Sequence, residues 1–69
     1  MSPTQQIIVA LIEFEGFPYL SDQIRTGNIS YSQSIEYINS IAWDLSTSEY
    51  EFLFNAINDF FKPTNQPTI

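Results

Sequence analysis

Hydrophobic positions in the first part of the chain recur at the spacing of an α-helix. The apolar stripe consists of Ile7, Ala10, Leu11 and Phe14, extended by Ile8 and Ile12. Val9 lies nearly opposite this stripe on a helical wheel. Ser2 and Gln5 form a capping box, and Gly16 is suited to the helix end. The pattern predicts a helix over residues 3–15 that is apolar almost all round, and such a helix is normally buried on more than one side.

Three further segments carry helical patterns. A short helix is predicted over residues 18–26, between Pro18 and Gly27. Two longer helices are predicted over 31–45 and 47–62, beginning at capping boxes that start with Ser30 and Ser46. The stripe of the first of these contains Tyr31, Ile35, Ile38, Ala42 and Leu45, and that of the second contains Tyr50, Leu53, Phe54, Ile57, Phe60 and Phe61. Pro63 stops the last helix.

Together these patterns predict an all-α fold. We expect a small bundle of three main helices, over about 3–15, 31–45 and 47–62, plus a short helix over about 18–26. The segment from Ile7 to Phe14 is also compatible with a buried strand, but no other segment alternates with period two to pair with it. Residues 1–63 are predicted to form a single helical domain, and residues 64–69 a flexible C-terminal tail.

The charge of the chain is strongly acidic. Eight Asp and Glu residues against two Lys and Arg residues give a net charge of −6, which repels phosphate backbones and anionic lipids. We therefore expect no direct nucleic-acid binding and no membrane binding. The apolar run from Ile7 to Phe14 is too short to span a bilayer, and no basic segment precedes it. These features lead us to expect a cytoplasmic protein.

Candidate catalytic and metal-binding chemistry is sparse. The chain has no His and no Cys, so the usual general base and thiol nucleophile are absent. Glu13 and Glu15 are candidates for a hydrolase or transferase that uses carboxylates alone, but residues two apart on a helix point in different directions. The segment from Asp44 has oxygens at alternate positions, as in a calcium loop, but Glu49 stands where Gly is required. We predict no catalytic residue, no metal site and no cofactor.

Aromatic side chains outside the predicted stripes provide a candidate binding surface. Trp43 and Tyr37 project away from the stripe of the third helix, and Phe52 lies outside that of the fourth. Such rings either pack against neighbouring helices or form an interface, and exposed Trp and Tyr are enriched at binding hot spots. The predicted partner-binding residues are these rings together with the surface acids: Tyr37, Trp43, Phe52, Glu36, Glu51 and Asp59.

The apolar excess of the first helix predicts self-association. Three or four short helices have little surface with which to cover a helix that is apolar all round. Ile8, Val9 and Ile12 are the predicted dimer interface.

These expectations lead to a functional hypothesis. The chain is predicted to be a non-enzymatic protein-interaction module, a homodimer that binds and regulates or inhibits another protein with a basic surface. The alternative is a nucleic-acid mimic that occupies a basic nucleic-acid-binding site by charge. In size and composition the chain is similar to the small acidic proteins that phages and mobile elements use against host machinery, which implies inhibition of a host protein.

Overall fold

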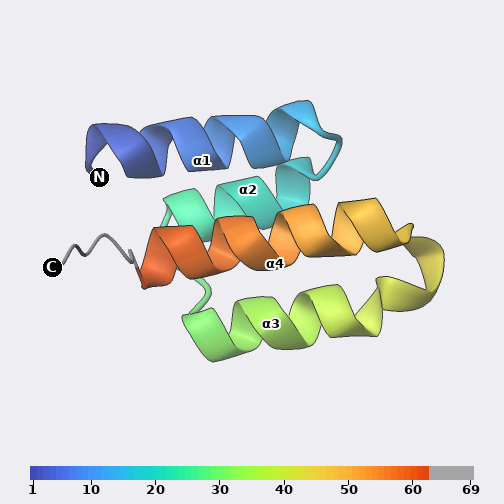
Figure 1. Ribbon diagram of the computed structural model, residues 1–69. Helices are drawn as coiled ribbons and strands as arrows, with labels where there is room; N and C mark the ends of the chain where they lie inside the picture. Colours follow the sequence, from blue (N-terminus) through green and yellow to red (C-terminus); the bar gives the residue numbers. More distant parts are fainter. Residues whose placement is uncertain (63–69) are drawn as a thin grey trace, which may run out of the picture.

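Four α-helices, joined by short turns, make up the part of the chain that the computed structural model describes, residues 1–62 (Figure 1). They are α1 (Pro3–Phe14), α2 (Pro18–Arg25), α3 (Tyr31–Ser40) and α4 (Thr47–Phe61), with a 3₁₀ turn, η1 (Ala42–Asp44), between α3 and α4. Residues 1–62 contain no strand, which confirms the all-α prediction. The predicted tail, residues 64–69, lies outside the described residues.

Capping boxes start three of the four helices. At Ser2, Ser30 and Ser46 the side-chain oxygen accepts a hydrogen bond of 3.1 Å from the backbone N–H three residues later. The side chain at that later position, Gln or Glu, accepts in return from the Ser N–H at 2.8–3.0 Å. Each box satisfies two backbone N–H groups that the helix itself cannot pair. The predicted starts of these helices are therefore confirmed.

Both glycines of the chain terminate helices in the left-handed conformation. Gly16 has φ of 106° and Gly27 has φ of 76°. After α1, the N–H of Phe17 reaches back to the carbonyl of Ile12 at 3.2 Å, and after α2 the equivalent bond is 3.0 Å long. This six-to-one bonding is the Schellman motif, which requires positive φ at the glycine. The chain thus leaves both helices at positions fixed by local sequence.

The third helix is shorter than predicted. The stripe predicted a helix over 31–45, but α3 ends at Ser40 and the chain continues through the turn η1. Leu45 is extended, with φ of −110° and ψ of 145°, because the next residue, Ser46, already caps α4. Reversing direction between two antiparallel helices needs non-helical residues, and this chain takes them from the end of the predicted helix.

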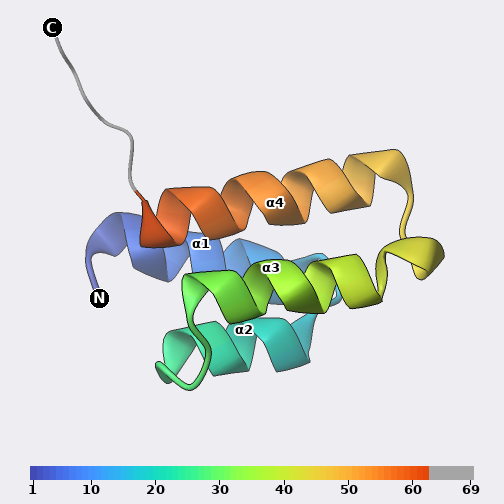
Figure 2. The same cartoon turned by 90° about the horizontal axis from the view of Figure 1, so that it is seen from below.

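The four helices surround one core. In Figures 1 and 2, α4 lies on one side of the molecule and α2 on the opposite side, with α1 and α3 between them at the two flanks. α1 packs against α2 and α4, and α3 packs against α4. The buried apolar side chains are Ile8, Val9, Ile12, Leu20, Ile24, Ile38, Leu53, Ala56, Ile57 and Phe60.

Polar contacts fix α1 against its neighbours. The hydroxyl of Ser21 in α2 is buried and donates to the carbonyl oxygen of Val9 at 2.7 Å. The side-chain amide of Gln5 donates to the carbonyl oxygen of Phe60, at the end of α4, at 3.1 Å. A buried hydroxyl without a partner would be costly, so the first of these bonds favours one rotation of α1 about its axis.

Two Tyr–Asn hydrogen bonds join α3 to α4. The Tyr31 hydroxyl, at the start of α3, donates to Asn58 Oδ1 near the end of α4 at 2.9 Å. The Tyr50 hydroxyl, near the start of α4, donates to Asn39 Oδ1 near the end of α3 at 2.5 Å. The two bonds lie at opposite ends of an antiparallel helix pair, so together they set the register between the helices.

Candidate protein-docking surface

The core face of α1 is the one that was predicted to form a dimer interface. Ile8, Val9 and Ile12 are 8%, 5% and 0% exposed within a single chain. They are covered because α2 and α4 pack on adjoining sides of α1, and Ser21 of α2 bonds directly to the backbone of Val9. The prediction that these three residues form a dimer interface is therefore wrong.

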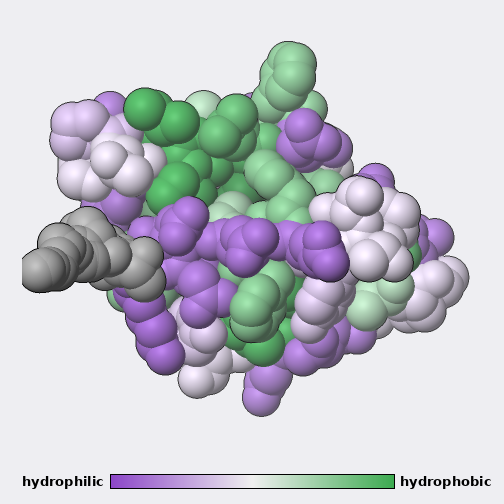
Figure 3. Space-filling view, in the orientation of Figure 1, coloured by the Kyte–Doolittle hydropathy of each residue, from purple (hydrophilic) through white to green (hydrophobic). Residues whose placement is uncertain are grey.

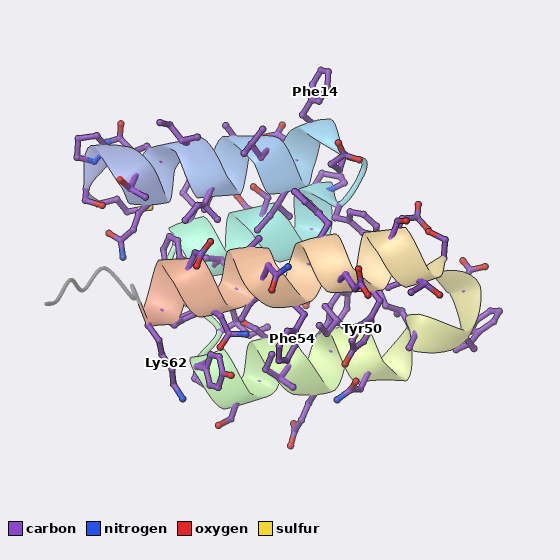
Figure 4. The ribbon with its side chains drawn as sticks, in the orientation of Figure 1. Phe14, Tyr50, Phe54 and Lys62 are labelled. Atoms are coloured by element: carbon purple, nitrogen blue, oxygen red, sulfur yellow. The ribbon has the colours of Figure 1, made fainter. Side chains whose placement is uncertain are left out.

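The opposite face of α1 is apolar and faces outward. Ile7, Leu11 and Phe14 are 60%, 46% and 85% exposed, and Ala10 between them is also exposed. Phe14 points away from every other helix (Figure 4). In the space-filling view a hydrophobic area extends over α1 and toward α4 (Figure 3). These side chains belong to the predicted stripe of the first helix, so most of that stripe lies outside the core.

A depression between α1 and α4 continues this apolar face. Its volume is about 150 Å³, and its lining residues are Ile8, Leu11, Phe52, Asn55, Ala56 and Asp59. Phe52 is half-buried here, so it packs against the neighbouring helix and also presents part of its ring. A depression of this size is suited to one large apolar side chain from another molecule.

An acidic row, interrupted by the neutral Asn55, runs along α4 beside the depression. Glu51, Asn55 and Asp59 follow one another at intervals of four residues, and all three are exposed. Asn55 and Asp59 line the depression, whereas Glu51 lies one turn beyond it and lines a separate depression near η1. Figure 3 shows a hydrophilic band along α4 below the hydrophobic area of α1. We call the apolar residues Ile7, Leu11, Phe14 and Phe52, together with this acidic row, the α1–α4 surface.

The two basic side chains of the protein are engaged away from this surface. Arg25 forms an ion pair with Asp22, three residues earlier in α2. The Lys62 ammonium lies 4.2 Å from the centre of the Tyr31 ring, a cation–π contact (Figure 4 labels Lys62). Neither of these two contacts involves an acid of the α1–α4 surface.

The six predicted partner-binding residues do not form one surface. Phe52 and Asp59 line the depression of the α1–α4 surface, and Glu51 lies one turn beyond it on the exposed side of α4. Glu36 and Tyr37 instead line an open groove of about 410 Å³ between α2 and α3, where Tyr37 contacts a tyrosine of α2 at 5.5 Å between ring centres. Trp43 lies in η1 and is 84% exposed. The six predicted residues therefore lie in three separate regions of the surface.

A further exposed ring lies on the other side of the acidic row. Phe54 is 40% exposed and stacks on Tyr50, with 6.2 Å between ring centres and 12° between planes. Figure 4 shows both rings on the side of α4 that faces α3. Tyr50 is held by its bond to Asn39, so this pair belongs to the packing of α3 against α4.

Ile7, Leu11 and Phe14 were predicted to belong to the apolar stripe of the first helix, but they were not predicted to be the exposed side of it. Hydrophobic periodicity could not find them, because apolar residues occur on every side of this segment. Val9, which lies nearly opposite the stripe, is on the side that the structure buries. The contact that covers this side involves the hydroxyl of Ser21, and a Ser in a sequence does not by itself indicate burial.

Acidic side chains of the described region do not assemble into a metal-binding cluster. Within residues 1–62, no group of three or more His, Cys, Asp or Glu residues is placed to hold a metal ion. Glu13 lines a depression of about 290 Å³ with Asp22 and Arg25, and Glu15 is not among its lining residues. The helices of residues 1–62 are also too short or too polar to cross a membrane.

Comparisons with known proteins give this chain no relative from which a function could be transferred. No protein-family model, curated protein or solved structure matches it.

Proposed function

We propose that the protein is a non-enzymatic interaction module that docks onto another protein through the α1–α4 surface and thereby regulates or inhibits it. The single observation that carries the proposal is the outward position of Ile7, Leu11 and Phe14. The opposite face of the same helix is already buried in a complete core, so these three side chains are not needed to build the fold.

The outward face is unusual for a helix of a small protein in water. A surface helix normally has polar side chains on its solvent side. Here three large apolar side chains follow one another over two turns and adjoin a depression lined by four apolar and two polar residues. Contiguous exposed apolar surface of this kind is typical of protein-binding sites. Scattered single residues would need no explanation.

Charge indicates the kind of partner. The chain has a net charge of −6, and the acidic row lies beside the apolar face. Complementary charge speeds association and selects among partners, while buried rings and aliphatic groups supply most of the affinity. We therefore propose a partner whose contact surface has an apolar centre and basic residues at its border.

A pair of matched variants tests the proposal. Phe14 and Trp43 are both large rings, 85% and 84% exposed, but only Phe14 lies on the α1–α4 surface. In affinity capture from an extract of the source cells, quantified by mass spectrometry, Phe14→Ser should reduce recovery of the specific partner by about tenfold or more. Trp43→Ser should leave it unchanged.

Two results would contradict the proposal. If no protein is captured specifically, the proposal that the chain is an interaction module is wrong. If Trp43→Ser abolishes capture and Phe14→Ser does not, docking occurs at η1 instead. Binding that survives Phe14→Ser but falls steeply with added salt would favour nucleic-acid mimicry.

A further inference from the structure

We infer that the occupant of the α1–α4 surface is an amphipathic helix of a partner protein, with apolar side chains on one face and Lys or Arg residues on the adjoining face. This inference rests on the proposed function and names the partner's chemistry. It follows from the shape of the surface, the spacing of its acids and the use that the chain makes of its own bases.

The shape of the surface suits a helix. α1 and α4 run side by side in opposite directions, and the depression lies between them (Figures 1 and 2). Ile7 and Phe14 are seven residues apart, about 10 Å along the helix axis, and Leu11 lies between them. A third helix laid along this line would meet all three with side chains at i, i+4 and i+7, the usual spacing of helix-in-groove recognition.

The acidic row sets the position of the partner's bases. Glu51 and Asp59 are eight residues apart, about 12 Å along α4. On a partner helix of the same rise, two basic residues seven or eight positions apart would reach both carboxylates. Because Asn55 and Asp59 of this row line the depression and Glu51 continues the row by one turn, these bases belong on the flank of the partner helix next to its apolar face.

A second copy of this chain does not have that chemistry. The whole sequence contains two basic residues. Arg25 is paired with Asp22, and Lys62 lies over the Tyr31 ring. Another copy would bring a further charge of −6 and would have to break one of these contacts to neutralise Glu51 or Asp59. The bases must therefore come from a different protein.

The test uses helical peptides displayed on phage and selected on the full-length protein. Every peptide carries Leu at i, i+4 and i+7, and its two flank positions, seven apart, are drawn from Lys, Glu, Gln and Ser. We expect the selected peptides to carry Lys at both flank positions. A synthesised Lys peptide should bind about tenfold more tightly than its Glu counterpart, because two ion pairs at the border of an apolar contact are replaced by repulsion.

A charge exchange provides the matched control. Selection on Glu51→Lys/Asp59→Lys should enrich Glu at the flank positions, and selection on Phe14→Ser should recover few peptides from either class. Circular dichroism of each variant should match the original protein, since all three positions are exposed.

Three outcomes would overturn the inference. In the first, the selected peptides show no preference at the flank positions. In the second, no peptide is selected. In the third, analytical ultracentrifugation shows a dimer that Phe14→Ser dissociates. The last result would identify a second copy as the occupant. None of these results decides the proposed function, which stands or falls with capture of a partner by the original protein and its loss in Phe14→Ser.

Discussion

The orientation of α1 can be tested by comparing two adjacent aliphatic side chains. Ile12 is fully buried, whereas its neighbour Leu11 is 46% exposed. We predict that Ile12→Ala lowers the free energy of unfolding by about 3 kcal/mol. Removing three buried carbons forfeits about 0.8 kcal/mol for each, and the cavity that remains adds to this loss. Leu11→Ala should cost about 1 kcal/mol or less, because about half of that side chain stays in water in the folded state and Ala favours the helix slightly.

Urea unfolding followed by circular dichroism at the helix band measures both values. A domain of this length has a total stability of about 3–10 kcal/mol, so Ile12→Ala should remain folded but close to its limit. Its thermal midpoint should fall by about 12 °C or more, and that of Leu11→Ala by about 8 °C or less. Ile12→Val, with an expected loss of about 0.5–1.5 kcal/mol, extends the comparison if the alanine variant is too unstable to handle.

Equal losses for the two alanine variants, or a larger loss for Leu11→Ala, would refute the described rotation of α1. Repeating the measurement at two protein concentrations is the control. An unfolding midpoint that rises with concentration would show that Leu11 is buried between copies, so that its loss would no longer report on a single chain.

Three further predictions follow from particular contacts. Ser21→Ala should cost about 1 kcal/mol in urea unfolding, because it removes the buried bond to Val9, whereas Ser32→Ala, at an exposed position of α3, should change stability by less than about 0.5 kcal/mol. Gly16→Ala should cost about 1 kcal/mol through its φ of 106° alone, since no atom lies within 4 Å of the added carbon; an unchanged midpoint would contradict the described helix end. Trp43, at 84% exposure, should emit like tryptophan in water and be quenched readily by acrylamide, and a blue-shifted, protected emission would show that η1 is covered.

Much of the secondary structure could be predicted because its signals are local. Each capping box involves residues three apart, and each Schellman motif requires only a glycine at the correct place. The predicted starts of α1, α3 and α4 therefore agree with the structure. The end of α3 was missed because an apolar stripe through Ala42 and Leu45 remains compatible with a helix even where the chain must reverse.

The candidate docking surface could be predicted only in part, because it depends on which sides of α1 are covered. Acidic positions on α4 followed from the fourth stripe, since Glu51 and Asp59 stand outside it. The apolar half depends on where α2 packs, and that is a long-range contact. The hydroxyl of Ser21 fixes the packing of α2 by donating to the backbone carbonyl of Val9. Every residue has a backbone carbonyl, so this contact leaves no mark in the sequence. Periodicity alone therefore could not show that Leu11 and Phe14 face outward.

The reciprocal Tyr–Asn bonds between α3 and α4 have a consequence for how the protein can vary its charge. Tyr31 and Tyr50 hold the two helices in alignment with neutral groups, and residues 1–62 contain a single ion pair, between Asp22 and Arg25. Alignment of the helices thus requires no carboxylate. Acidic positions on the outside of the bundle can be gained, lost or exchanged while the scaffold stays the same, so the surface charge is able to change independently of architecture.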